Sequence, residues 1–104
     1  MKEKFLVPHN KQILLIHFEK IMFFKADNSY TDLHLTDESR FVLCKSLSQV
    51  EIEINSPTFL RIHQSYLINK EKISLIDKEN KTVKMENGLM LPFTLKVKEL
   101  INNL

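Results

Sequence analysis

Apolar and polar residues alternate with a period close to two over most of this 104-residue chain. That alternation is typical of β-strands with one buried face. It predicts short strands, separated by polar turn clusters, over residues 13–18, 21–25, 30–36, 40–44, 59–63, 66–69, 73–77, 82–85 and 89–93. Short polar turns between consecutive strands indicate antiparallel hairpins, as in residues 30–44 and 73–93.

Two stretches instead repeat their apolar residues every three or four positions, which predicts helices. Ser46 is a suitable N-cap for the first, whose apolar face carries Leu47, Val50 and Ile54 before residues 55–57 close it. Thr94 is a suitable N-cap for the second, whose apolar members are Leu95, Val97, Leu100, Ile101 and Leu104. We therefore expect a mainly β fold with two short helices.

Length and composition fit a single globular domain. Apolar residues make up 43% of the chain, and one glycine with three prolines excludes collagen-like and low-complexity classes. We place the domain at residues 13–104 and interpret residues 1–12 as a tether or an extra edge strand. The longest apolar runs, such as residues 13–16, are too short to span a bilayer, and Pro8 and His9 interrupt any signal-peptide core. We expect a soluble, cytoplasmic protein.

Residue types that many enzymes need are scarce or unsuitably spaced. Gly88 is the only glycine, so phosphate-cradling loops are excluded, and no serine lies in a Gly-x-Ser-x-Gly elbow. Cys44 is the only cysteine, which excludes an internal disulfide and a cysteine-rich zinc site. Glu51 and Glu53 have the spacing of a solvated helix face. We expect neither an enzyme nor a bound cofactor.

The four histidines show no ligand spacing such as His-x-His or HExxH, so we expect no metal site. His63 is interpreted as a structural residue that is hydrogen-bonded to backbone within the sheet. One alternative stays open, because His34 and His63 lie on separate predicted strands that can be neighbours. In that case they form part of a small-molecule or metal site.

Basic and acidic residues number 15 and 13, and the formal net charge of +2 does not by itself indicate nucleic acid. Polar, aromatic and basic side chains nevertheless gather at predicted turns, at residues 29–30, 63–65 and 94–96. These side chains are either ordinary surface or a loop-borne site on a rigid β scaffold. In the second case, loop side chains enter a nucleic-acid groove.

One stretch is more specific, since residues 59–69 read Phe-Leu-Arg-Ile-His-Gln-Ser-Tyr-Leu-Ile-Asn, with Ile73 four residues later. This sequence resembles the central motif of LytTR domains, the DNA-binding output modules of LytR/AlgR/Agr-type bacterial response regulators. Further matches follow in the same order at residues 21–26, 28–30, 46–47, 87–88 and 91–94. The resemblance runs from about residue 13 to residue 104, nearly the whole chain.

The resemblance implies an elongated, mainly β domain of small stacked antiparallel sheets that binds double-stranded promoter DNA and regulates transcription. Members of the family insert loops between strands into DNA grooves instead of a recognition helix. Carried over by motif, the base contacts fall at Tyr30, Gln64 and Lys96. Contacts to the DNA backbone fall at Ser29, Arg61, Ser65 and Lys70. His63 and Asn69 are structural residues of the motif, and Arg61 is also a candidate for an ion pair that braces the sheet.

The chain departs from the family pattern near the expected base contacts. Gln64 stands where many members have Arg, Lys or Asn, Leu95 where Arg is frequent, and Lys96 replaces a common Arg. Lysine lacks the planar fork that suits a guanine edge, whereas glutamine can pair bidentately with adenine. An alternative function is therefore a LytTR-fold protein-interaction or regulatory module with weak or no DNA binding.

Members of the family usually follow a receiver domain or a membrane segment, so the chain is either free-standing or the C-terminal part of a longer regulator. By resemblance we expect a monomer in solution that pairs on its DNA site. A reading surface of this kind requires that the bends carrying Tyr30, Gln64 and Lys96 lie exposed on a common side of the molecule.

Overall fold

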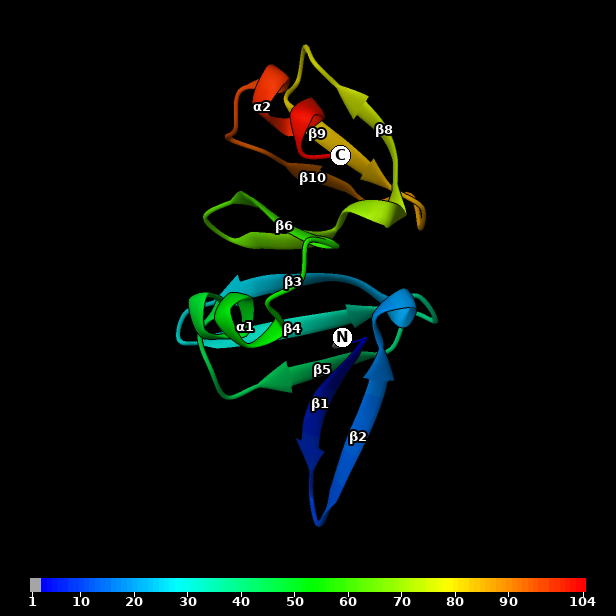
Figure 1. The fold of residues 1–104 in the computed structure, drawn as a ribbon, viewed down its shortest axis with the longest axis vertical. Coiled ribbons are helices and arrows are strands. Elements are labelled where there is room, and N and C mark those ends of the chain that lie inside the picture. Colours follow the sequence, from blue (N-terminus) through cyan, green and yellow to red (C-terminus); the bar gives the residue numbers. More distant parts are fainter. Residues whose placement is uncertain (1–2) are drawn as a thin grey trace.

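The computed structural model describes residues 3–104, which form three antiparallel sheets stacked along one axis. The Cα positions extend over 46 × 26 × 25 Å, so the molecule is elongated (Figure 1). A two-stranded sheet lies at one end, a five-stranded sheet in the middle and a three-stranded sheet at the other end. The expected fold, a mainly β stack of small antiparallel sheets with two short α-helices, is confirmed.

The middle sheet has the strand order β5-β4-β3-β7-β6. Its strands are β3 (Ile21–Asp27), β4 (Tyr30–Leu35), β5 (Arg40–Leu43), β6 (Phe59–His63) and β7 (Tyr66–Asn69). Two-residue polar turns join β3 to β4 and β6 to β7, as the sequence predicts. Because residues 21–24 are all buried, β3 needs cover on both faces and lies at the centre of the sheet.

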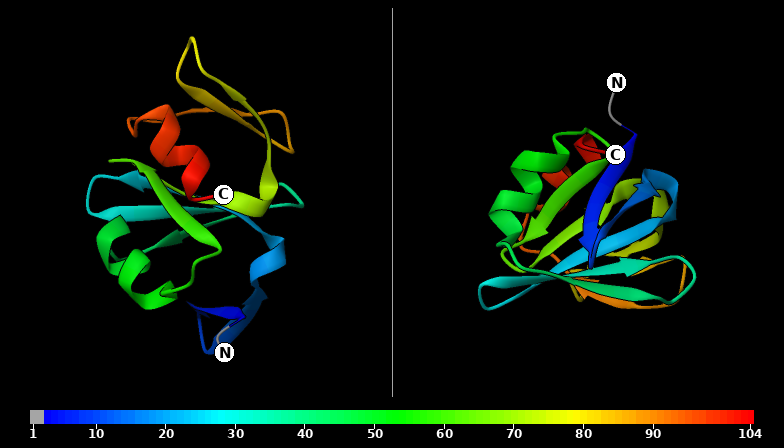
Figure 2. Two further views of the ribbon diagram at one scale, coloured as in Figure 1. Left: turned by 45° about the horizontal axis from the view of Figure 1, so that its top comes forward. Right: turned by 90° about the horizontal axis from the view of Figure 1, so that it is seen from below.

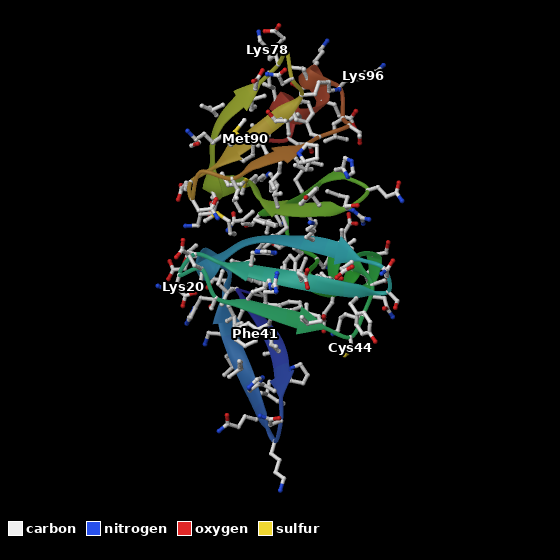
Figure 3. The ribbon with its side chains drawn as sticks, turned by 180° about the vertical axis from the view of Figure 1, so that it is seen from behind. Lys20, Phe41, Cys44, Lys78, Met90 and Lys96 are labelled. Atoms are coloured by element: carbon white, nitrogen blue, oxygen red, sulfur yellow. The ribbon has the colours of Figure 1, made fainter. Side chains whose placement is uncertain are left out.

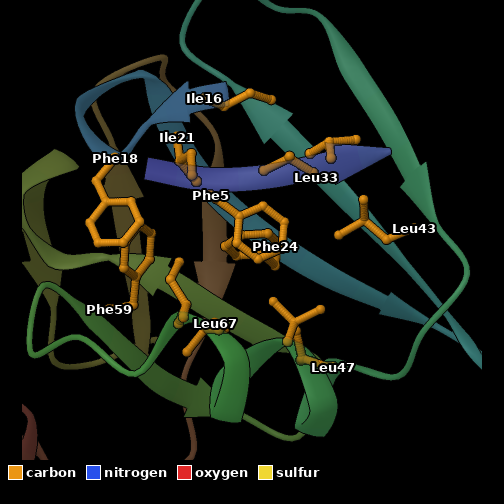
Figure 4. Packing of buried hydrophobic residues seen from close by; sticks show 13 residues of the cluster. Phe5, Ile16, Phe18, Ile21, Phe24, Leu33, Leu43, Leu47, Phe59 and Leu67 are labelled. Carbon is orange, nitrogen blue, oxygen red and sulfur yellow. The ribbon is translucent and has the colours of Figure 1, made fainter. Parts of the chain in front are cut away.

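A helix and a hairpin cover one face of the middle sheet, and both lie on the same side of it (Figure 2, right). These elements are α1 (Leu47–Ile54), β1 (Lys4–His9) and β2 (Gln12–His17). Phe5 of β1 packs into the sheet core with Phe24, Leu33 and Leu67 (Figure 4). The rings of Phe5 and Phe24 meet edge to face, with centroids 5.2 Å apart. Residues 4–9 of the N-terminal segment therefore form a strand that contributes to the core, while residues 1–2 lie outside the described part.

Ser46 caps α1 as predicted. Its Oγ accepts the Gln49 N–H at 3.2 Å, and Gln49 Oε1 accepts the Ser46 N–H at 2.8 Å. This reciprocal pair is a capping box, which satisfies two donors that the first turn of a helix leaves free. Asn55, with a left-handed φ of 36°, ends the helix.

The C-terminal third of the chain packs against the opposite face of the sheet, near β6 and β7. Its elements are β8 (Ile73–Asp77), β9 (Thr82–Met85), β10 (Met90–Pro92) and α2 (Val97–Asn102). Phe23, Ile62, Val83, Phe93 and Leu100 belong to the second apolar cluster, which joins the three-stranded sheet and α2 to the middle sheet. Each half of the molecule therefore has its own core on its own face of the middle sheet.

The prediction that Thr94 caps the second helix is wrong, because α2 begins at Val97 with Lys96 as its N-cap. The Thr94 N–H donates to the Ile62 carbonyl at 2.9 Å, and the Leu95 carbonyl accepts from Lys81 Nζ at 2.7 Å. These tertiary bonds use the backbone groups of residues 94–95, so the helix starts later than its apolar pattern does.

Two one-turn 3-10 helices that the sequence pattern does not predict link strands of the molecule. They are η1 (Phe18–Lys20), between β2 and β3, and η2 (Lys70–Lys72), between β7 and β8.

Within residues 3–104, no helix is long and apolar enough to cross a membrane.

Candidate nucleic-acid interface

The turns β3–β4 and β6–β7 lie next to each other because β3 and β7 are antiparallel neighbours. Lys25 is opposite Tyr66 in their register, so the end of β3 and the start of β7 meet at one end of the sheet. The Ala26 N–H donates to the Ser65 carbonyl at 2.9 Å. This bond fixes the β6–β7 turn beside the strand that leads into the β3–β4 turn.

The third predicted segment, the connection from β10 to α2, is fixed beside β6. The Thr94 N–H reaches the Ile62 carbonyl of β6, and the preceding Phe93 is buried in the second apolar cluster. Leu95 packs against the same cluster, which explains why a hydrophobic residue occupies this position. Lys96 is the exposed cation that remains in the connection.

All three connections turn at one side of the molecule, at the left of Figure 1. In the view from behind, Lys96 lies at that side, while Lys20 lies at the opposite one (Figure 3). Gln64, Lys96 and Ser29 are exposed, Tyr30 is 49% exposed and Ser65 is half-buried. The bends are therefore on a common side, and their predicted base-contacting side chains are accessible to a ligand.

Arg61 holds the β6–β7 turn from within the molecule. Its Nε donates to the His63 carbonyl at 3.0 Å, and its Nη2 donates to the Gln64 carbonyl. Its Nη1 donates to Glu51 Oε1 of α1 at 2.9 Å, which forms an ion pair, one of the two roles that the sequence left open for Arg61. Glu51 therefore does not belong to a purely solvated helix face, and Glu53 likewise pairs with Lys45 at 2.9 Å.

His63 and Asn69 have structural contacts at the two ends of the β6–β7 hairpin. His63 Nδ1 accepts the Ser65 N–H at 2.9 Å, so the ring closes the turn that carries Gln64. Asn69 is fully buried, and its Nδ2 donates to the carbonyls of Phe18 and Ile21. Its Oδ1 accepts the Glu71 N–H, which joins β7 to η2.

Lys70 is not brought to the other predicted contacts. It follows Asn69 at the end of the β6–β7 hairpin opposite the Gln64 turn, since Phe59 is paired with Asn69. Its Nζ donates to the Asn103 carbonyl at 2.7 Å near the C-terminus. This position does not suit a phosphate contact beside Gln64.

His34 and His63 are also kept apart. The His34 ring stacks on Phe23 with centroids 4.3 Å apart, whereas the His63 ring lies edge-on to Tyr66. Burial lowers the pKa of His34 below its ordinary value of 6.5, Arg40 and Lys25 lower it further, and Asp32 opposes them. Among residues 3–104, no group of three or more His, Cys, Asp or Glu side chains could hold a metal ion.

A fourth segment on this side, residues 44–46 between β5 and α1, carries none of the contacts predicted from the sequence. Cys44 lies at the same side as Lys96 in Figure 3. Thr31, next to Tyr30, is paired with Leu43, and its Oγ1 donates to the Lys45 carbonyl at 2.9 Å. The predicted hairpin of residues 30–44 already indicates that residue 44 lies near Tyr30, because a hairpin returns its last residues beside its first ones.

The fold and this surface define a class of protein, a β-built domain that presents short connecting segments with polar and basic side chains on one side. The chain belongs to the LytTr DNA-binding domain family, which it matches over residues 11–104. The resemblance found in the sequence is thus confirmed, and the chain is a LytTr-type DNA-binding domain.

Comparison with individual proteins agrees with this assignment. Two heme-containing CO-sensing transcriptional regulators of Paraburkholderia xenovorans (strain LB400), RcoM 2 and RcoM 1, are 29% and 27% identical over 66 residues, which is 64% of this chain. The chain spans only about a quarter of their length, since the matched part is 24% of each. The LytTr DNA-binding domain of a Bacillus cereus protein described as a methyl-accepting/DNA response regulator has the same fold. That domain superposes with a TM-score of 0.74 at 23% identity and covers 90% of this chain and 88% of its own.

Proposed function

We propose that this domain recognises a specific sequence in double-stranded promoter DNA through side chains of three connections that enter the grooves. Gln64 pairs with a base edge from the β6–β7 turn, and adenine is the base that its amide matches. Tyr30 and Lys96 contact bases from the neighbouring connections. Ser29 and Ser65 donate hydrogen bonds to phosphates beside them.

The observation that carries this proposal is the arrangement of the three connections on one exposed side of the molecule. Two strand spacings, about 10 Å, separate the centres of the hairpins β3–β4 and β6–β7. The β10–α2 connection follows beyond β6 along the 46 Å axis of the molecule. Because the three connections follow one another along this axis on one side, they can contact successive positions along one face of a duplex.

Charge on this side is modest, which makes base contacts important. Lys25, Lys96 and Lys98 are exposed near the three connections, while Lys45 is paired with Glu53. Each phosphate that these lysines neutralise releases counterions, so the affinity falls as salt rises. With a formal net charge of only +2, the attraction of the domain to DNA of any sequence is limited. Discrimination between DNA sequences therefore depends on groups that contact bases, such as the Gln64 amide.

Selection of bound sites from a random DNA pool, followed by anisotropy titrations at several salt concentrations, tests the proposal. We expect one preferred sequence, and a log-log salt dependence with a slope of about −0.9 per phosphate contacted. Equal affinity for the selected and scrambled duplexes, or no binding at low salt, would refute it.

Matched variants test the individual contacts. Gln64→Ala should lower the preference for the selected site by roughly 5- to 150-fold, equivalent to about 1–3 kcal/mol, whereas Gln12→Ala in the N-terminal hairpin should leave it unchanged. Lys96→Ala should weaken binding, whereas Lys20→Ala, which removes an exposed lysine from the opposite side, should not. Tyr30→Ala should relax the preference at other base positions than Gln64→Ala does.

A second candidate is a protein-interaction module on the same fold. Its support is Leu95, which packs inward and leaves the β10–α2 connection with one cation fewer than the family pattern. Capture of a defined protein partner, together with no DNA shift at low salt, would favour this candidate over DNA recognition. The main proposal includes pairing of two copies on one DNA site, and the length of the DNA footprint at saturation tests this pairing.

A further inference from the structure

The guanidinium of Arg61 connects the β6–β7 turn to helix α1. It donates to two successive carbonyls of the β6–β7 turn, those of His63 and Gln64, and to the carboxylate of Glu51 on α1. Arginine has five N–H donors in a rigid plane, and three of them are used here inside the protein. The remaining two donors point from a side chain that is only 25% exposed.

The other backbone groups of the turn are also fixed. The Ser65 N–H donates to His63 Nδ1, and the Ser65 carbonyl accepts from the Ala26 N–H. Because both neighbours of the Gln64 Cα are held in this way, the main freedom left at this position is that of its own side chain. A base-reading amide needs this restriction, since its two hydrogen bonds fit only one orientation toward a base edge.

Helix α1 gives the guanidinium a firm support. The capping box at Ser46 and Gln49 fixes the start of the helix, and Val50 and Ile54 are buried in the first apolar cluster. Glu51 is on this anchored helix, so its carboxylate is held where Nη1 meets it at 2.9 Å. The charge of Glu51 compensates Arg61 within the protein, which reduces the attraction of Arg61 for phosphate.

We propose that Arg61 and Glu51 together form a positioning pair that determines sequence specificity by orienting Gln64, and that the function of Arg61 is not a phosphate contact. This inference rests on the proposed DNA recognition by Gln64. It assigns to α1, which supplies no base contact, a role in specificity. It also explains why an arginine and not a lysine stands in this position, because only a planar fork reaches two turn carbonyls and a carboxylate at once.

Two conservative variants separate positioning from phosphate binding. Arg61→Lys keeps the charge but loses the fork, so positioning predicts a fall of roughly tenfold or more in the preference for the selected over a scrambled duplex. A phosphate contact predicts that this variant keeps both the preference and the affinity. Glu51→Gln keeps an acceptor but removes the charge, and positioning again predicts a lower preference, whereas a phosphate contact predicts tighter binding to every duplex.

Glu53→Gln is the matched control. It removes the same charge from the same helix. It breaks the ion pair with Lys45, whose ammonium group bonds to Glu53 on α1 and not to the β6–β7 turn. We expect it to change the affinity for all duplexes equally and to leave the preference unchanged. A salt slope that becomes shallower by about 0.9 in Arg61→Ala, with equal loss for every sequence, would overturn the inference in favour of a phosphate contact.

Amide hydrogen exchange without DNA provides a readout that does not depend on the proposed function. Positioning predicts faster exchange at the hydrogen-bonded amides of Ser65 and Ala26 in Arg61→Lys and Glu51→Gln, and unchanged exchange in Glu53→Gln and at the β1–β2 hairpin. Unchanged exchange of the turn in both variants would refute the pair. If the native chain binds no DNA while the turn loosens as expected, the proposed function fails and the structural part of the inference stands.

Discussion

Asn69→Ala tests whether the family motif contains a residue that acts purely on stability. Asn69 has an exposed fraction of 0%, and its amide makes three hydrogen bonds, to the carbonyls of Phe18 and Ile21 and from the N–H of Glu71. Alanine removes all three hydrogen bonds at once. The two bonds to carbonyls are buried and the bond from the Glu71 N–H is partly buried, so water cannot fully replace them.

The magnitude follows from this count. A buried hydrogen bond contributes about 1 kcal/mol net, and an unsatisfied buried partner costs about 1–3 kcal/mol. Three bonds therefore predict a loss of about 3 kcal/mol or more in the free energy of unfolding, out of roughly 5–15 kcal/mol for a domain of this kind. At about 4–8 °C per kcal/mol, Tm should fall by about 12–24 °C.

Urea unfolding followed by circular dichroism measures this loss, with unchanged m-values as the sign that the unfolding transition is the same. Asn102→Ala is the control, because Asn102 is exposed on α2 and makes no side-chain hydrogen bond to any residue in the range 3–104. Its free energy of unfolding should change by less than about 0.5 kcal/mol. A loss below about 1 kcal/mol in Asn69→Ala would show that the three bonds do not hold η1, β7 and η2 together as argued.

Two further predictions concern local features of the fold. Ser46→Ala should remove the capping box of α1 and lower the free energy of unfolding by about 1 kcal/mol, whereas Ser48→Ala, on the exposed part of the same helix, should change it little in the same urea assay. Burial lowers the pKa of His34, so the unfolded chain binds more protons at this residue. The contribution of neutral His34 to the free energy of unfolding is complete above about pH 6.5. It is lost as the pH falls through the lower pKa of the folded state. The unfolding free energy of His34→Gln should therefore decline less than that of the native chain between about pH 7.5 and about pH 5. An equal decline in both proteins would contradict the assignment to His34.

The hairpins, the turn residues and the cap of α1 were predictable from the sequence because each depends on neighbours a few positions away. Alternation places Leu33 inward whatever the rest of the chain does, and Ser46 with Gln49 forms its box within one turn of helix. The motif of residues 59–69 also determined the family, and with it the segments that meet on one side of the molecule.

Contacts between distant segments were decided only by the tertiary structure. Thr94 is not the cap because tertiary bonds hold the backbone of residues 94–95 against β6 and Lys81, so α2 begins only after Lys96. Lys70 lies far from Gln64 because a four-residue strand separates the two ends of the hairpin. The pairing of Glu51 with Arg61 depends on how α1 packs across the sheet, which no local spacing encodes. Local pattern thus determines which side chains face the core, whereas the partners of the remaining polar groups depend on which elements the core brings together.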